Sequence, residues 1–251
     1  MRDWMVTRSC CALIFFLFSL NIQAQQKITF PSRDGVTITA DWYPVADTCP
    51  VILLCHQAGF SRGEYESTAV RLNKFGFNCL AMDQRFGEEV NGVKNETAAD
   101  AKRLSKPRTN ADAEQDITSA VDFLYDKYHK KVMLLGSSYS ASLALKIAKE
   151  NNHVMSVMAF SPGEYFEQKN FFGHYVDGLN KPVFITSSKE EADGVTDLVK
   201  DIVSVIKVQY IPMSAGDHGS KVLWSSKPYN EEYWIALMSF LSRMKKLAEH
   251  E

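Results

Sequence analysis

The sequence predicts an α/β fold in which a mostly parallel sheet of about eight strands is covered by helices on both faces. Short apolar runs alternate with longer amphipathic segments, and 251 residues suit one large domain of this class. Val51–Cys55 is apolar at every position, which is typical of a strand buried on both faces of a parallel sheet. This run and the alternation of elements together indicate the fold class.

The expected strands begin with 27–30 and 36–43, which flank Asp34-Gly35 and therefore favour an antiparallel hairpin at the sheet edge. The remaining strands are expected at 51–55, 78–82, 132–135, 153–160, 183–186 and 208–211. Helices are expected between them, at 65–75, 110–128, 141–149, 195–206 and 231–247.

Several local signals set the expected helix ends. Gly76 is well placed as the stop of the first helix, while Asn110 and Asn230 are the expected N-caps of the second and the last. The segment 84–109 is polar and shows no clear period, so we expect it to be a long surface loop.

Residues 1–24 have the pattern of a secretory signal peptide. Arg2 and Arg8 precede the apolar run 11–20, and Ala24 supplies a small residue at the expected cleavage point. The run is short for a membrane span, which needs about 20 apolar residues, although an uncleaved anchor is the alternative. We therefore expect an exported protein, periplasmic or secreted, whose residues 25–251 form one domain with no stable membrane anchor.

Composition excludes several classes of partner. A net charge of −2 and the lack of a basic tract argue against nucleic acid as a partner. Only Cys49, Cys55 and Cys79 follow the expected signal, so at most one disulfide can form. We expect Cys55 and Cys79 to be core residues, with a nucleophilic role for Cys55 as the alternative. No pattern of cysteines or histidines indicates a metal site, and no cofactor is implied.

The turn Gly136–Ser140 carries the most informative chemistry. It follows an apolar strand and opens a helix, the context in which a G-x-S-x-G-like turn exposes a nucleophilic serine, here Ser138. Gly136 and Ala141 meet the need for small residues where strand and helix nearly touch, although Ser140 replaces the usual second glycine. An ordinary serine-rich turn is the alternative.

A serine nucleophile needs a base and an acid, which this topology places at the carboxyl ends of strands. His218 lies in a loop of small residues after the last strand, so it is the expected base. The loop after the preceding strand offers Glu190, Glu191 and Asp193 as the acid. The chain order of serine, acid and histidine differs from that of trypsin-like and subtilisin-like proteases.

These motifs, together with His56-Gln-Ala-Gly59 and Asp83-Gln-Arg-Phe-Gly87, make the chain similar to the α/β-hydrolase superfamily. Within it, the chain resembles dienelactone-hydrolase-like serine esterases over nearly all of the expected mature length. The resemblance implies the α/β-hydrolase fold, Ser138 as nucleophile and His218 as base. It also implies Glu191 as the acid, counted from Pro182, with Glu190 and Asp193 still open.

The resemblance further implies an oxyanion hole made by the backbone N–H groups of Tyr139 and Ala58. It places a minimal lid at 161–175, whose aromatic residues are expected to line a substrate pocket or, alternatively, to pack on the core. These are Tyr165, Phe166, Phe171, Phe172 and Tyr175, with Phe166, Phe172 and Tyr175 as the preferred pocket residues. Dienelactone hydrolases themselves carry a cysteine nucleophile, so their particular substrate is not implied.

The expected function is therefore that of an exported serine hydrolase of carboxylesterase type, acting on a small-molecule ester through an acyl-enzyme. A peptidase or amidase of the same fold, or an inactive binding module, are the alternatives. Natural substrate, acyl length and oligomeric state are not readable from the sequence.

The signal peptide gives a testable prediction. Expressed in an exporting host, the mature chain should begin at or near Gln25, because cleavage is expected after Ala24. Intact-mass spectrometry of the purified product checks this, and an exported product that retains Met1 would contradict it.

Overall fold

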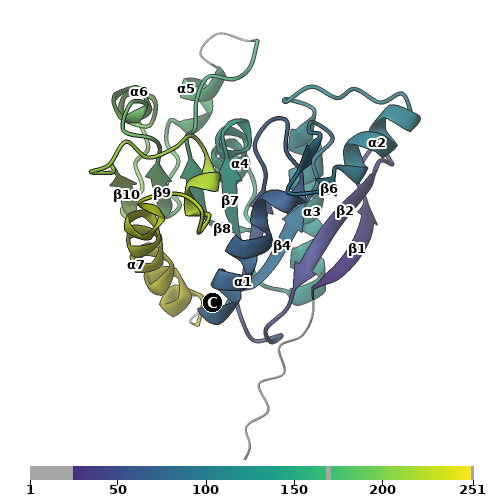
Figure 1. The fold of residues 1–251 in the computed structure, drawn as a ribbon, viewed down its shortest axis with the longest axis horizontal. Coiled ribbons are helices and arrows are strands. Elements are labelled where there is room, and N and C mark those ends of the chain that lie inside the picture. The colour runs from purple at the N-terminus through teal and green to yellow at the C-terminus, as the bar shows by residue number, and fades with distance from the viewer. Residues whose placement is uncertain (1–24, 168–170, 250–251) are drawn as a thin grey trace, which may run out of the picture.

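An eight-stranded sheet in the order β1-β2-β4-β3-β7-β8-β9-β10 organises the computed structural model, which describes residues 25–167 and 171–249 (Figure 1). β1 and β2 form the predicted edge hairpin, β2 pairs antiparallel with β4, and the other neighbours are parallel. The predicted fold class is thus confirmed. The strands are β1 (Gln26–Pro31), β2 (Thr37–Tyr43), β3 (Val51–Cys55), β4 (Asn78–Met82), β7 (Val132–Ser137), β8 (Val154–Phe160), β9 (Val183–Thr186) and β10 (Lys207–Tyr210).

Helices cover both faces of this sheet, and the sheet separates the apolar core into two clusters, one on each face. Alternate side chains of β3 point to opposite faces, so Leu53 packs in one apolar cluster and Leu54 in the other. α3 (Ala113–Tyr128) and α4 (Tyr139–Glu150) cover the first face, whereas α1 (Glu66–Lys74) and α7 (Asn230–Ala248) cover the second, in front in Figure 1. The shorter helices are η1 (Arg62–Tyr65), α2 (Glu96–Arg103), α5 (Phe171–Val176), α6 (Ala192–Leu198) and η2 (Ser220–Leu223).

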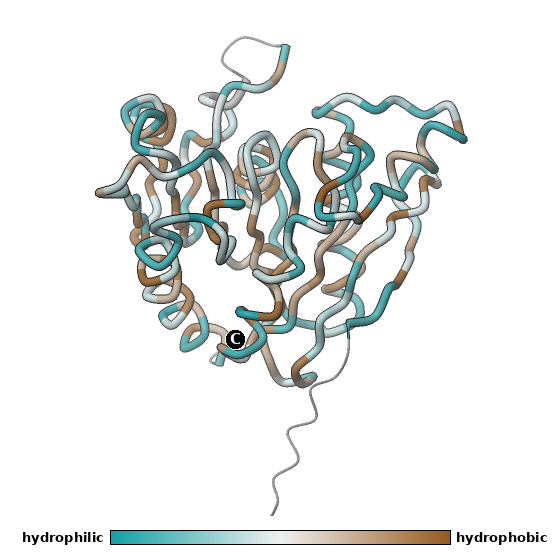
Figure 2. The backbone as a smooth tube through the Cα atoms, in the orientation of Figure 1, coloured by the Kyte–Doolittle hydropathy of each residue, from teal (hydrophilic) through white to brown (hydrophobic). Residues whose placement is uncertain are grey.

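The apolar stretches of the backbone gather along the central strands (Figure 2). Val51–Cys55 is buried at every position, as its uninterrupted apolar run predicted. None of the helices in the described part of the chain is both long and apolar enough to cross a membrane.

The prediction of a long loop at 84–109 is wrong, because this segment contains β5 (Glu89–Val90), β6 (Val93–Lys94) and α2. Asn91 and Gly92 both have positive φ and join β5 to β6 in a small antiparallel hairpin, a turn type that an Asn-Gly pair favours. Asn95 then caps α2 by accepting the Ala98 N–H over 2.8 Å. Only small residues of α2 are buried, so its apolar period is weak in the sequence.

Three expected helix ends are also wrong. α3 begins at Ala113, and the Asn110 side chain instead accepts the Ala111 N–H over 2.8 Å and donates to the Tyr165 carbonyl. Asn230 is the first residue of α7 rather than its cap, and its side chain donates to the Lys227 carbonyl. The helix expected at 195–206 is α6, which ends at Leu198 before the exposed Val203 and Val205.

Two buried arginines fix the loops that follow β3 and β4. Arg62 pairs with Asp83 over 2.7 Å and with Asp41 over 3.1 Å. Arg85, which is fully buried, pairs with Asp116 of α3 over 2.7 Å. Breaking such a buried pair costs about 3–5 kcal/mol, so the loops at the carboxyl ends of these strands are held firmly to the fold.

Candidate active site

Ser138 occupies a strained turn between β7 and α4, with φ 59° and ψ −126°. Positive φ is uncommon for any residue other than glycine, so the surrounding structure must enforce it. The strand and helix backbones meet at Gly136, where an added Cβ would lie 2.5 Å from the Ser140 carbonyl oxygen and 2.7 Å from Ala141. A side chain at Gly136 would therefore push the two elements apart and relax the turn.

His218 connects Ser138 to Glu191. Its Nε2 lies 2.9 Å from Ser138 Oγ, and its Nδ1 lies 2.5 Å from Glu191 Oε1. An ionised carboxylate only accepts hydrogen bonds, so Nδ1 carries the imidazole proton and Nε2 is left as the acceptor of the Ser138 hydroxyl. Ser138 and Glu191 immediately precede α4 and α6, and His218 lies in the loop between β10 and η2. The three side chains form one continuous series of hydrogen bonds.

Glu191 is the carboxylate that hydrogen-bonds to His218 in the structure. Burial alone would raise its pKa, but hydrogen bonds from His218, Ser161 and Ser188 outweigh burial and lower the pKa to about 2. Ser161 Oγ donates to Oε2 over 2.7 Å, and Ser188 donates both its N–H and its hydroxyl over 3.0 Å. The competing sequence candidates, Glu190 and Asp193, have exposed side chains.

The backbone N–H groups of Tyr139 and Ala58 are the expected donors of the oxyanion hole. Tyr139 is the first residue of α4, and N–H groups in a first helical turn lack an intrahelical acceptor. The positive end of the helix dipole adds to their pull on an anion. The Ala58 N–H forms no hydrogen bond with any other described residue.

The orientation of the Ala58 N–H follows from His56. The His56 Nδ1 lies 2.8 Å from the Gln57 carbonyl oxygen, and its Nε2 accepts the Gln84 N–H over 3.0 Å. Burial lowers the pKa of His56 to about 4, so the ring stays neutral and donates to Gln57 from Nδ1. In a trans peptide the C=O and N–H are opposed, so the Ala58 N–H points away from His56.

Glu64, a fully buried carboxylate, joins the loops around the site. Its Oε2 accepts the Gln57 N–H over 2.8 Å, so Gln57 is not a free donor, whereas the Ala58 N–H has no partner among the described residues. Its Oε1 lies 2.6 Å from Ser220 Oγ, just beyond His218. Sequence reasoning missed Glu64, Ser161 and Ser188, because a lone polar residue in a short helical turn or a loop carries no distinguishing pattern.

The aromatic residues expected to line a substrate pocket make different contacts in the structure. Phe166 packs against the core cluster that contains α3 and α4. The Tyr175 ring lies 4.7 Å from the Lys146 ammonium of α4. The side chain of Phe172 lies outside what the structure describes. Tyr165, from the same aromatic segment, stands edge-on to the His218 ring with the ring centroids 6.4 Å apart.

Cys55, the alternative nucleophile, is fully buried at the end of β3, and burial raises its thiol pKa far above the ordinary value. Cys49, Cys55 and Cys79 are all free thiols. A thiol in this state is a core group and no nucleophile.

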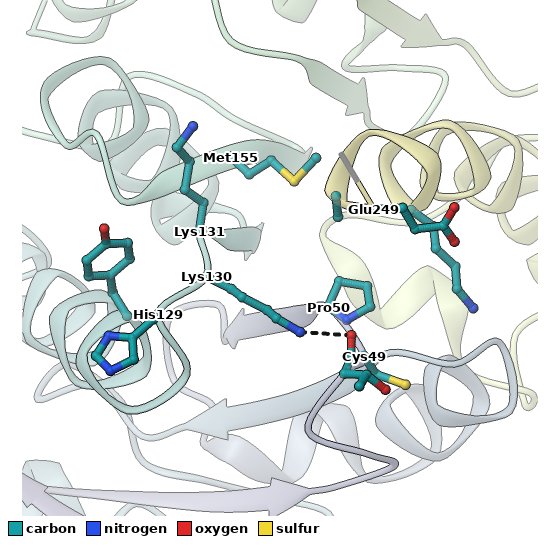
Figure 3. A pocket seen from close by; sticks show the side chains of 11 residues that line it. Cys49, Pro50, His129, Lys130, Lys131, Met155 and Glu249 are labelled. Carbon is teal, nitrogen blue, oxygen red and sulfur yellow. Dashed lines mark hydrogen bonds between the residues drawn. The ribbon is translucent and has the colours of Figure 1, made fainter. Parts of the chain in front are cut away.

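A pocket of about 570 Å³ lies at the amino ends of the strands, between Cys49, Lys130, Lys131, Met155 and Glu249 (Figure 3). Lys130 Nζ there donates to the Thr48 carbonyl oxygen over 2.9 Å. The candidate triad is at the opposite, carboxyl edge of the sheet, where ligands of α/β proteins bind. A hollow of about 710 Å³ there is lined by Glu191 and His218, whereas Ser138 itself is buried.

The chain belongs to the dienelactone hydrolase family, whose model matches residues 35–214. Ser138 and Glu191 lie within the matched range, and His218 follows shortly after it. Among curated protein sequences, no relative matches.

Solved structures with the same fold include esterases and dienelactone hydrolases. An esterase of Pyrococcus furiosus is 18% identical with a TM-score of 0.65, covering 95% of this chain and 98% of its own. An esterase of the archaeon Pyrobaculum calidifontis is 17% identical with a TM-score of 0.64, covering 90% of this chain and 85% of its own. A dienelactone hydrolase of Anabaena variabilis is 16% identical with a TM-score of 0.64, covering 86% and 95%. At these identities the likeness establishes the α/β-hydrolase fold.

The contacts of Glu191 predict a specific dependence of stability on pH. Its pKa falls from 4.5 to about 2 on folding, so its ionised form stabilises the fold above pH 4.5 and this contribution fades as pH falls toward 2. The difference in unfolding free energy between wild type and Glu191→Gln should therefore be constant above about pH 5 and shrink below it.

Urea denaturation between pH 2 and 7 measures this difference. Glu190→Gln, which removes an exposed carboxylate from the same loop, is the matched control and should follow the wild type throughout. A gap between Glu191→Gln and wild type that stays constant down to pH 2 would contradict the assignment of these contacts.

Proposed function

We propose that the protein is a serine hydrolase that cleaves carboxylic esters through an acyl-enzyme on Ser138. The observation that carries the proposal is the unbroken chain of hydrogen bonds from Ser138 through His218 to Glu191, built on a strained turn. Membership in the dienelactone hydrolase family supports a hydrolase, and the esterases among the structural neighbours support an ester substrate.

In this mechanism Ser138 Oγ attacks the ester carbonyl carbon while His218 Nε2 takes its proton. Glu191 holds the imidazole in the tautomer that accepts this proton and stabilises the imidazolium that results. The N–H groups of Tyr139 and Ala58 receive the negative charge on the carbonyl oxygen. His218 then protonates the leaving alkoxide, and water hydrolyses the acyl-enzyme by the same steps in reverse.

The same residues could also cleave amide bonds. Comparing the hydrolysis rates of an ester and an amide that share one acyl group tests which bond the enzyme prefers. An acylaminoacyl peptidase of Pyrococcus horikoshii shares the fold at 15% identity and a TM-score of 0.65, but the match covers only 43% of its chain. We propose the ester because the structural neighbours include esterases that match over most of their own length.

We also propose that the enzyme acts outside the cytoplasm, in the periplasm or as a secreted protein. The support is the sequence pattern of residues 1–24, a basic start followed by a short apolar run and Ala24. The substrate is then an ester available in that compartment.

Ser138→Ala should abolish ester hydrolysis and labelling by a fluorophosphonate probe, while the fold survives. Loss of such a nucleophile lowers turnover by about a millionfold in a serine protease. The measurements are aryl-ester hydrolysis and in-gel fluorescence of the labelled protein.

Ser137→Ala is the neighbouring control. Its hydroxyl is buried and accepts the Ser220 N–H over 2.8 Å, so it faces away from the substrate. Labelling that persists in Ser138→Ala but disappears in Ser137→Ala would show that the nucleophile has been misassigned, and a wild type that is never labelled would favour a binding module.

A further inference from the structure

Tyr165 lies at the candidate nucleophile, although it belongs to the loop between β8 and α5. Its ring stands edge-on to the His218 imidazole, with centroids 6.4 Å apart and planes at 84°. Its hydroxyl donates to the Ser161 carbonyl oxygen over 2.8 Å, and the phenol also interacts with the Ser138 side chain. The phenol oxygen is therefore a neighbour of the oxygen atom that reacts.

The loop holds Tyr165 in this position by several contacts. Ser142 of α4 accepts the Gly163 N–H over 2.9 Å and donates to the Gly163 carbonyl over 2.8 Å. The Tyr165 N–H donates to the same carbonyl, and Asn110 donates to the Tyr165 carbonyl. An added Cβ on Gly163 would lie 2.7 Å from Tyr165 Cζ, so the ring packs directly on a glycine backbone.

The protons available to Tyr165 and Ser138 differ between the free enzyme and the acyl-enzyme. In the free protein the Ser138 proton points to His218 and the Tyr165 proton points to Ser161, so no proton lies between the two hydroxyl oxygens. In the acyl-enzyme Ser138 Oγ is an ester oxygen that has no proton and only accepts. The Tyr165 hydroxyl can then turn its one proton from the Ser161 carbonyl oxygen to Ser138 Oγ.

We propose that Tyr165 is a further catalytic residue, which donates a hydrogen bond to Ser138 Oγ while the acyl-enzyme is hydrolysed. This inference rests on the proposed function. Water attacks the acyl carbon and gives a proton to His218; the carbon–Oγ bond then breaks, and Oγ keeps the electron pair and takes that proton. Tyr165 retains its own proton throughout and stabilises the charge that develops on Oγ.

The same hydrogen bond gives no advantage during acylation. Ser138 Oγ is then the attacking atom, and a donor bound to its lone pair makes it a weaker nucleophile. Removal of the Tyr165 hydroxyl should therefore slow deacylation selectively. A merely structural role would slow both steps together, because both use the same His218 and the same oxyanion donors.

The test is Tyr165→Phe, with each step measured separately using p-nitrophenyl acetate. Stopped-flow release of p-nitrophenolate gives the acylation rate, and intact-mass spectrometry follows decay of the acetylated enzyme. Deacylation should slow about tenfold, the effect of one hydrogen bond to a charged oxygen, while acylation changes by less than about twofold. In the steady state kcat and KM should fall together.

Tyr43→Phe is the matched control, because the buried Tyr43 hydroxyl has no hydrogen-bond partner among the described residues. It should acetylate and deacetylate as the wild type does. Equal slowing of both steps in Tyr165→Phe, or unchanged deacylation, would overturn the role of Tyr165. If the wild type itself forms no acyl-enzyme on Ser138, the proposed function fails as well, so the two failures are distinguishable.

Discussion

The close approach of β7 and α4 at Gly136 is the constraint on which the candidate site depends. Strand and helix backbones meet there with no room for a Cβ, and the chain can turn between them only if Ser138 accepts a positive φ. That turn exposes Oγ to His218 and leaves the Tyr139 N–H at the open start of α4. The position of the candidate nucleophile and that of the candidate anion-binding N–H therefore follow from a single backbone geometry.

Buried polar residues that never face substrate set the rest of the geometry. His56 and Glu64 hold the two sides of Gln57, so the neighbouring Ala58 N–H is directed by the fold rather than by a ligand. Ser161 donates to Glu191 and accepts the Gly219 N–H over 3.0 Å, which ties the acid to the residue after His218. Such preorganised dipoles need no rearrangement when charge develops.

Much of this arrangement could be predicted from the sequence, because its signals are local. An uninterrupted apolar run located β3, and the apolar residues after Asn78 located β4. The order of Ser138, the acidic loop and His218 placed the triad candidates at the carboxyl ends of strands. α2 was missed because it buries only small residues. The choice of Glu191 over its neighbours, and the position of Tyr165, depend on long-range contacts that no local pattern encodes.

The hydrogen bond between Glu191 and His218 is tested most directly by replacing each acidic residue of the loop with its amide and measuring acylation of an aryl ester. Glu191→Gln should slow acylation by about 10⁴, as removal of this charge does in a serine protease. Glu190→Gln and Asp193→Asn, which remove exposed carboxylates, should leave the rate close to that of the wild type. Near-normal acylation in Glu191→Gln would contradict the account.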